Sequence, residues 1–467
     1  MWVRFTRVQP HSLAATEVDQ SRRLKAEILA HSHPVAARFA PATAGFLLFC
    51  CNAVAQEMVP SDISEPNPAP LTPAQVQVLQ SGSTPGTAPG STSGRAVSET
   101  PRRFQYNFSA SERNVYDDNI NISSSNRRSD FYFAIEPAMA IGFGDSESVS
   151  SFSLIYRPSL FLYLDNSQDD TVQHVIRLQA AHTFGRLALS LTQDMQILNG
   201  ADLNSISDPT GHNANTDVGG RTRHDIYMSA LSGTYQLSGK LFLSSAGNLS
   251  IDDYPNGQIG SKSFSGNLFI NYEYREKIVV GLGGTGGYSI ADDSSPDQIY
   301  EQANVRVGYN ATAKIRFNAS TGVEFREFSN NSRGIYVSPV YALDAAYQAF
   351  DGTSITLGGS RHTANSASLA GQDYVSTDIH CAVSQRFMQR ISLGIAAGYQ
   401  NSEYISIING IAATRSDNYY YVEPSVNVNI TRFWTAGAYY LHRNNASSFN
   451  FFSFYDNQVG FRTTVTF

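Results

Sequence analysis

Charged side chains are scarce in this sequence of 467 residues, at 16%, and no apolar run is long enough to form a membrane-spanning helix. Nucleophile and metalloprotease patterns of the G-x-S-x-G and H-E-x-x-H types are absent, as are paired cysteines. His174 and His182 share one parity of a predicted strand, but eight residues span about 26 Å, so they cannot bind one ion. We therefore predict no enzyme, no cofactor and no metal centre, and place both histidines at membrane interfaces.

Glycine and aromatic residues are abundant instead: the chain has 35 Gly, 25 Tyr and 27 Phe. Low charge combined with many glycines and aromatic rings is typical of strands that show one face to lipid and the other to water.

The N-terminal region has the pattern of a secretory signal. Arg38 precedes the short apolar core of residues 44–51, and Ala53-Val54-Ala55 forms an A-x-A cleavage pattern. We predict an extension and signal over residues 1–55, with cleavage after Ala55. Cleavage would remove Cys50 and Cys51 and leave Cys381 alone, which excludes an internal disulfide in the mature chain.

Residues 56–103 are rich in Pro, Ser, Thr, Gly and Ala, a composition that cannot bury enough apolar surface to fold. We predict a disordered periplasmic linker there, which leaves residues 104–467 as the folded part. The formal net charge of the whole chain is -7, and the predicted signal carries more basic than acidic residues. An anionic mature chain argues against nucleic acid as a partner.

From Phe104 onward the hydrophobic pattern has a period of two, as in Phe264, Leu268, Ile270 and Tyr272 against polar residues of the other parity. Short turns alternate with long polar connections. Tight turns at one end and long loops at the other are typical of transmembrane barrels. We predict an all-β fold: an antiparallel up-and-down outer-membrane barrel of about eighteen strands, with sixteen as the alternative. The terminal alternation ending in Phe467 resembles the signal recognised by the barrel assembly machinery.

The segment Gly281-Leu282-Gly283-Gly284-Thr285-Gly286 matches the G-x-G-x-x-G spacing of dinucleotide-binding turns. That fingerprint requires a helix after it, whereas here the alternation continues through Tyr288 into a polar loop. The glycines are better explained by strand curvature or by space needed inside the barrel.

Charged residues on the polar parity are the candidates to line a pore. For about half of them we expect a structural role instead, as cross-strand pairs that brace the barrel wall. Both signs occur, which favours a hydrated passage without strong ion selectivity. The candidates are Arg157, Arg177, Asp194, Glu273, Arg306, Arg316, Glu324, Arg326, Asp378, His380, Glu423 and Arg462. The inward aromatic residues Phe161, Tyr163, Tyr419 and Tyr421 are candidates to stack on sugar rings, with a packing or girdle role as the other expectation for each.

The stretch Tyr116-Asp117-Asp118-Asn119-Ile120, followed by Ser129-Asp130-Phe131 and Pro137, resembles the first hairpin of the β-barrel porin 2 family. Members are outer-membrane barrels of Gram-negative bacteria that accompany exopolysaccharide synthesis and export. The resemblance implies a porin-like conduit for exopolysaccharide, with lipopolysaccharide, secreted polysaccharide and periplasmic export machinery as partners. A general diffusion porin for small solutes and a plugged structural or adhesin barrel are the alternatives.

The depth of the same stretch follows from strand geometry. Twelve residues separate Phe104 from Tyr116, and a strand tilted by roughly 40° then rises about 30 Å along the barrel axis. We predict that Tyr116 belongs to the outer aromatic girdle and that Asp117, Asp118 and Asn119 lie at the mouth. Cation bridging to lipopolysaccharide by the two aspartates is a further hypothesis, and a catalytic pair is disfavoured.

Overall fold

The computed structural model describes residues 104–467 except 145–148, 203–211, 276, 293–294, 313, 330–333, 351 and 409–414. The predicted signal (1–55) and linker (56–103) lie outside the described residues. In the described part of the chain, no helix is both long and apolar enough to cross a membrane.

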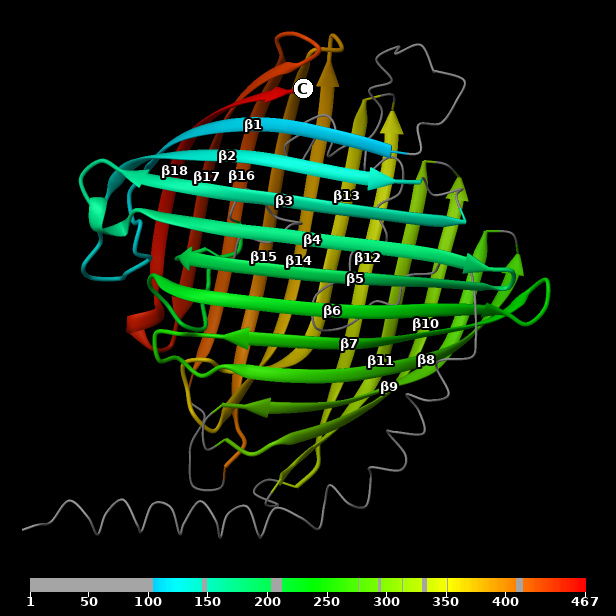
Figure 1. The fold of residues 1–467 in the computed structure, drawn as a ribbon. Helices are drawn as coiled ribbons and strands as arrows, with labels where there is room; N and C mark the ends of the chain where they lie inside the picture. Colours follow the sequence, from blue (N-terminus) through cyan, green and yellow to red (C-terminus); the bar gives the residue numbers. More distant parts are fainter. Residues whose placement is uncertain are drawn as a thin grey trace, which may run out of the picture. The chain divides into compact units, whose positions relative to one another are not determined.

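Eighteen strands make up nearly all of the described chain (Figure 1). Two single-turn 3-10 helices, η2 (Ser167–Asp169) and η4 (Asn450–Phe452), lie in connections. The strands are β1 (Phe104–Asp117), β2 (Asp130–Phe143), β3 (Ser150–Tyr163), β4 (Thr171–Phe184), β5 (Leu187–Gly200), β6 (Thr222–Gln236), β7 (Leu241–Asp253), β8 (Ser261–Arg275), β9 (Ile278–Ala291), β10 (Gln298–Thr312), β11 (Ile315–Phe328), β12 (Tyr336–Phe350), β13 (Thr353–Asn365), β14 (Gln372–Phe387), β15 (Ile391–Ser406), β16 (Ser416–Asn429), β17 (Trp434–Ser447) and β18 (Phe454–Thr466).

Each strand pairs antiparallel with its neighbours in sequence, and β1 also pairs with β18. The sheet is therefore a closed up-and-down barrel, which leaves no unpaired edge. This confirms the predicted fold class with eighteen strands. Figure 1 shows the tilt that closure requires: the strands of the near wall cross those of the far wall at a steep angle.

The connections differ in length between the two ends of the barrel. At one end, here the short-turn end, β4 and β5 are joined by residues 185–186, with Gly185 in the left-handed region at φ 64°. At the other, here the long-loop end, β5 and β6 are joined by residues 201–221. The alternation follows the prediction, although the connection 144–149 between β2 and β3 is longer than the other short turns.

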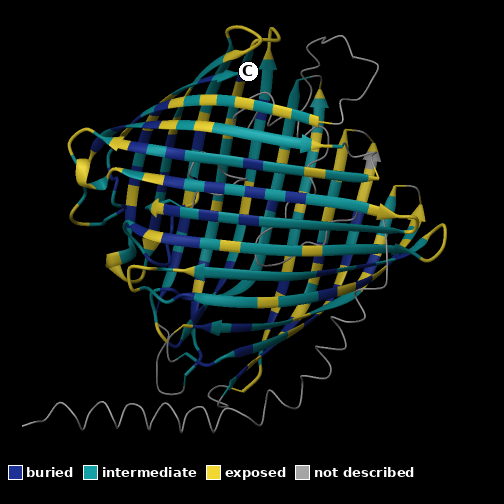
Figure 2. Cartoon of the chain, in the orientation of Figure 1, coloured by how far each residue is buried: buried dark blue, intermediate teal, exposed yellow. Residues whose placement is uncertain are grey.

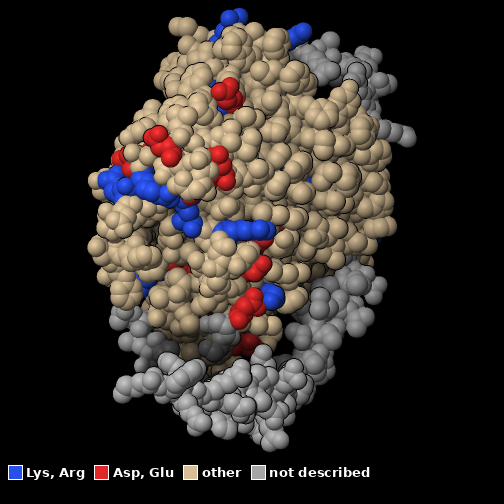
Figure 3. Space-filling model, turned by 60° about the vertical axis from the view of Figure 1, so that its left-hand side comes forward, with Lys and Arg blue, Asp and Glu red and all other residues tan. Residues whose placement is uncertain are grey.

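The outer wall of the barrel is apolar. Phe104, Tyr106, Phe108 and Tyr116 lie on one face of β1 and are all exposed, Tyr116 to 48%. The same alternation of exposed and buried residues recurs along the other strands (Figure 2), and wide areas of the surface carry no charged side chain (Figure 3). Aromatic residues gather on this wall at the short-turn end: Phe143, Phe184, Tyr274, Tyr309, Phe350, Phe387, Phe433 and Trp434.

Phe467 follows the end of β18. Its backbone N–H donates to the carbonyl oxygen of Phe108 at 2.8 Å, and its side chain is 80% exposed. The chain terminus is thus held against β1 while the ring stays accessible. Recognition of this residue by the assembly machinery stays a prediction.

The residues Asp118 and Asn119 fasten the first hairpin to the last strand at the long-loop end. Asn457 donates its backbone N–H to Asp118 Oδ1 at 2.9 Å and its side-chain amide to Oδ2 at 2.8 Å. Asn119 donates its amide to the carbonyl oxygens of Tyr455, at 2.8 Å, and Ser123, at 3.0 Å. We call these contacts the seam clasp, because they join the two strands whose pairing closes the barrel.

The glycines of β9 create space for side chains of neighbouring strands. A Cβ atom on Gly283 would lie 2.2 Å from the carbonyl oxygen of Leu268 and 2.5 Å from the ring of Phe269. A Cβ atom on Gly287 would overlap the ring of Tyr300. The G-x-G-x-x-G segment therefore lies within a strand, as predicted, and at least Gly283 and Gly287 are needed for packing.

We predict that Gly283→Ala destabilises the barrel by about 1–3 kcal/mol, because the new methyl group overlaps a carbonyl oxygen that cannot move without shifting β8. Gly286→Ala is the matched control, since a Cβ atom there meets nothing within 4 Å. Urea unfolding of both variants in lipid vesicles measures the difference. Equal stability of the two would contradict this explanation of the glycines.

Candidate pore and its constriction

All twelve predicted pore-lining residues lie on the strand face opposite to the exposed aromatic side chains, which is the inward face. They do not form one site. Seven charged residues, five of them predicted, lie at mid-height on seven strands, namely β16, β18 and β1 to β5. This charged half-ring consists of Glu423, Arg462, Arg113, Glu136, Arg157, Arg177 and Asp194.

Ion pairs hold most of the half-ring together. Arg177 and Asp194 form a buried bidentate pair, with Nε–Oδ1 at 2.6 Å and Nη2–Oδ2 at 2.7 Å. Glu136 lies between two arginines, 2.9 Å from Arg113 Nη2 and 3.5 Å from Arg462 Nη2. The predicted bracing role therefore applies to these residues.

Arg157 differs from the other arginines of the half-ring. Its guanidinium interacts over longer distances with the charges of Arg177, Arg462 and Glu136. It has no hydrogen-bond or ion-pair partner among the described residues. The half-ring contains four arginines and three acids, so Arg157 supplies a positive charge that no carboxylate neutralises directly. A guanidinium in this position is available to a passing anion.

The other predicted residues are distributed around the barrel. Arg306 donates to Asn271 Oδ1 at 2.9 Å and lies over the ring of Phe269, and Arg326 pairs with Glu324 at 2.9 Å. Four further predicted residues are more exposed than these buried ones. Glu273 and Arg316 lie near the short-turn end, and Asp378 and His380 lie at mid-height on β14. His380 Nδ1 is 3.5 Å from Asp378 Oδ2.

Part of the wall near the short-turn end carries small inward side chains, namely Ala138, Ala140, Ser151 and Ser153 on β2 and β3 and Gly394 and Ala396 on β15. Phe242 on β7 and Arg316 on β11 are larger inward residues near the same end. Towards the long-loop end the inward side chains are large and mostly buried, as in Arg113, Tyr132, Phe161 and Tyr419. Figure 2 shows buried residues concentrated in that half of the near wall.

The described residues 212–221 of the β5–β6 connection contact β16 inside the barrel. Within this segment, His212 stacks on Tyr421 of β16, with ring centroids 4.6 Å apart, and its Nε2 lies 3.0 Å from Glu423 Oε2. The Tyr419 hydroxyl donates to the carbonyl oxygen of His212. Six strands lie between β16 and β5, the nearer end of this connection, so the described residues 212–221 lie within the mouth rather than along the rim.

Asp217 anchors the same connection to two further loops. Its carboxylate accepts hydrogen bonds from Ser366 Oγ at 2.9 Å, Ala367 N at 2.6 Å and Tyr404 Oη at 2.7 Å. Arg415 donates to the Asp217 carbonyl oxygen at 2.9 Å. These contacts, which we call the Asp217 latch, hold the segment within the mouth.

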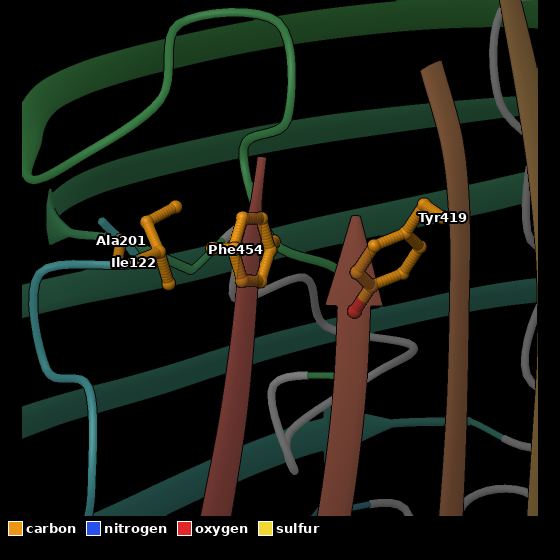
Figure 4. Close-up of a cluster of buried hydrophobic side chains, with 5 residues drawn as sticks. Ile122, Ala201, Tyr419 and Phe454 are labelled. Carbon is orange, nitrogen blue, oxygen red and sulfur yellow. The ribbon is translucent and has the colours of Figure 1, made fainter. Parts of the chain in front are cut away.

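An apolar cluster supports the latch from the other side (Figure 4). Ile122 of the β1–β2 connection, Ala201 and Ala214 pack with Phe454 and Tyr419. Figure 4 shows the Phe454 ring between Ile122 and Tyr419. Burying these side chains favours the inward position of the segment, because each would otherwise face water.

Two loop residues near the connection keep their ordinary protonation states. Burial lowers the pKa of Arg221, but the adjacent Tyr163 hydroxyl and Asp169 outweigh that effect and raise it above its usual value. Burial, with the charges of Asp252 and Asp217, raises the pKa of Tyr254 well above the ordinary value. Arg221 is thus a permanent cation and Tyr254 a neutral phenol at the mouth.

The inward aromatic residues proposed for sugar stacking are engaged with the protein. Phe161 and Tyr419 are buried, Tyr163 lies under the guanidinium of Arg221 at 4.8 Å, and Tyr421 stacks on His212. All four side chains therefore pack within the protein, the other role expected for them: Phe161 and Tyr419 are buried, and Tyr163 and Tyr421 each have one ring face covered.

Sequence reasoning missed several residues of this region. Arg113 and Glu136 satisfy the same parity rule as the predicted set and could have been found by it. His212 and Asp217 lie in a long connection without periodicity, so no local pattern shows that they contact β16 and the β13–β14 loop.

The two histidines of β4 lie near opposite strand ends. His174 accepts or donates a hydrogen bond with Tyr156 Oη at 3.0 Å, and His182 Nδ1 lies 2.6 Å from Ser150 Oγ. Both lie on the outward face beside aromatic rings, as expected for residues at the two interfaces.

No family model matches the chain. No curated protein matches it either. Solved structures similar to it include the outer membrane protein OpdK of Pseudomonas aeruginosa (TM-score 0.41, 10% identity, 78% of this chain and 98% of that chain). OpdO of Pseudomonas aeruginosa (0.42, 11%, 78% and 97%) and OccAB3 of Acinetobacter baumannii (0.41, 10%, 78% and 100%) are also similar.

The architecture of the barrel indicates that the protein resides in the outer membrane. A closed barrel with an apolar, aromatic-rich outer wall and a polar interior satisfies every backbone group within lipid. The chain is an outer-membrane β-barrel of porin-like fold. The short-turn end is then periplasmic and the long-loop end faces outward. Tyr116 lies on the outward face of β1, next to the strand end at the long-loop end.

We predict that Asp194→Ala lowers the free energy of unfolding by about 3–5 kcal/mol, since it leaves the buried Arg177 without its partner. The side chains of this pair are 7% and 5% exposed. Arg223 and Asp225 form a pair of similar geometry in which the arginine is 45% exposed. Urea unfolding should show a much smaller cost for Asp225→Ala, which leaves only the exposed Arg223 without its partner, and equal costs for Asp194→Ala and Asp225→Ala would refute the argument from burial.

Proposed function

We propose that this protein is a passive channel for small hydrophilic solutes, narrowed at its outer half by the β5–β6 connection. The observation that carries the proposal is the position of His212 and Asp217 inside the mouth of a barrel whose wall carries small inward side chains on β2, β3 and β15 towards the periplasmic end. A barrel of eighteen strands is wide enough for an aqueous passage. An inward segment reduces that passage to the size of a small molecule.

The charged half-ring supports a preference for anionic solutes at the narrow part of the channel. The unpartnered Arg157, on β3 in the same half-ring as the Glu423 that His212 reaches, favours solutes that carry a carboxylate or phosphate. Mixed charge around it limits the preference to a modest one, in agreement with the expectation from sequence.

Exopolysaccharide export, the main expectation from the family resemblance, has no support in the described residues. A polymer would have to displace the Asp217 latch and the cluster around Phe454, and the inward aromatic side chains already pack within the protein. A plugged structural barrel is the remaining alternative, and conductance separates it from a channel.

We predict that Asp217→Ala produces frequent openings to a larger conductance in planar bilayers. Hydrogen bonds to a charged group contribute about 1.5–3 kcal/mol each, so losing the three to Asp217 shifts the latched population by a factor of about 1,000 or more. Asp225→Ala, at the outer end of β6 and paired with Arg223 outside the passage, is the control. Absence of any conductance in the parent and in Asp217→Ala would reject the channel and favour the plugged barrel.

We predict that Arg157→Glu shifts the reversal potential in a salt gradient towards cation selectivity, because it changes the sign of the unpartnered charge at mid-height. Arg316→Glu makes the same change near the periplasmic end, on an exposed residue, and should shift the potential less. Equal shifts from the two variants would contradict a narrow part at the half-ring.

A further inference from the structure

Three carboxylates meet at the outer end of the barrel seam. Asp117 ends β1, Asp118 follows it, and Asp456 lies near the start of β18. One oxygen from each lies within 4.8 Å of one oxygen from each of the others. Two of the three are buried, Asp117 with 4% and Asp456 with 0% exposure. Like charges this close cannot all remain ionised without a compensating positive charge.

The hydrogen bonds of the site leave one buried acceptor free. Asp117 accepts from Asn119 N at 2.7 Å and from Gln458 Nε2 at 3.1 Å. Asp456 Oδ2 accepts from Arg443 Nε at 2.5 Å and from Gln458 Nε2 at 3.1 Å. Asp456 Oδ1 has no hydrogen-bond partner among the described residues. A completely buried carboxylate oxygen without a donor points to a ligand that is a cation.

The neighbouring arginines do not balance the charge. Arg443 is shared between Asp456 and Asp202, at 2.5 Å and 2.6 Å, and Arg127 pairs with Asp118 at 2.9 Å. Arg221, which also interacts with Asp169, adds positive charge beside Asp202. No arginine of the described residues forms an ion pair with Asp117, so its buried carboxylate still lacks a directly paired cation.

We propose that a calcium ion binds between Asp117, Asp118 and Asp456 and cross-links the first strand to the last at the outer mouth. Calcium prefers oxygen ligands at about 2.3–2.6 Å and accepts water in its remaining positions. A polar pocket lined by Asp117, Asp202 and Arg443 gives water access to one side of the site. The proposal is independent of what passes through the barrel.

This placement differs from cation bridging to lipopolysaccharide. Asp117 and Asp456 face inward and are buried, so they cannot reach a lipid phosphate on the outer wall. Only Asp118 is partly exposed, to 26% of its side chain. The cation would stabilise the seam clasp from within the protein.

The test uses the full chain refolded in detergent without lipopolysaccharide, so that no lipid phosphate holds the ion. We expect calcium, titrated to about 10 mM, to raise the unfolding temperature by several degrees, and terbium to show sensitised luminescence that calcium displaces. Asp456→Asn and Asp118→Asn should lose most of both responses. Asp225→Asn, a buried aspartate at the outer end of β6, should keep them.

Three outcomes would overturn the proposal. The first is a parent protein whose unfolding temperature and terbium signal do not respond to calcium. The second is an unfolding temperature that changes between about pH 5 and pH 8 but not with calcium, because a proton shared between the carboxylates then balances the charge. The third is an equal loss of response in Asp225→Asn, which would show non-specific binding. If Asp456→Asn fails to fold, the parent and Asp118→Asn still decide the question.

Discussion

Pairing of β1 with β18 is the interaction on which the rest of this structure depends. A sheet of eighteen strands has two edges until these strands meet, and in lipid an open edge would leave a row of backbone groups without partners. The seam clasp concentrates side-chain bonds at the outer end of that pairing, where Asp118 and Asn119 hold Asn457 and Tyr455. The same place collects the buried carboxylates of Asp117 and Asp456. The seam clasp and the proposed calcium site thus lie at the same place, the outer end of the β1–β18 pairing.

Closure also makes the interior contacts possible. Once the wall is a ring, residues of β16 face the end of β5 across a short distance, and the β5–β6 connection can reach them. Charged side chains on neighbouring strands then brace the wall between these two regions. Arg157 remains outside that bracing, which is why we assign it to the passing solute rather than to the fold.

The porin-like fold and the proposed small-solute channel rest on different evidence. The fold follows from strand pairing and an apolar outer wall, whereas the channel is inferred from the small inward side chains towards the periplasmic end and the narrowing by His212 and Asp217. The resemblance of the first hairpin to exopolysaccharide-associated barrels carries neither conclusion, because its Tyr-Asp-Asp-Asn motif acts here in closing the barrel.

The sequence by itself determined the strands, their alternation and the difference between the two barrel ends, because a period of two and short turns are local properties. It also placed Arg157, Arg177 and Asp194 on the inward face by parity alone. It did not show that Asp217 reaches Ser366 and Tyr404, that His212 stacks on Tyr421, or that Asp456 lies beside Asp117. Those contacts join residues more than a hundred positions apart, and only closure of the ring, with the tilt and register that it requires, brings them together.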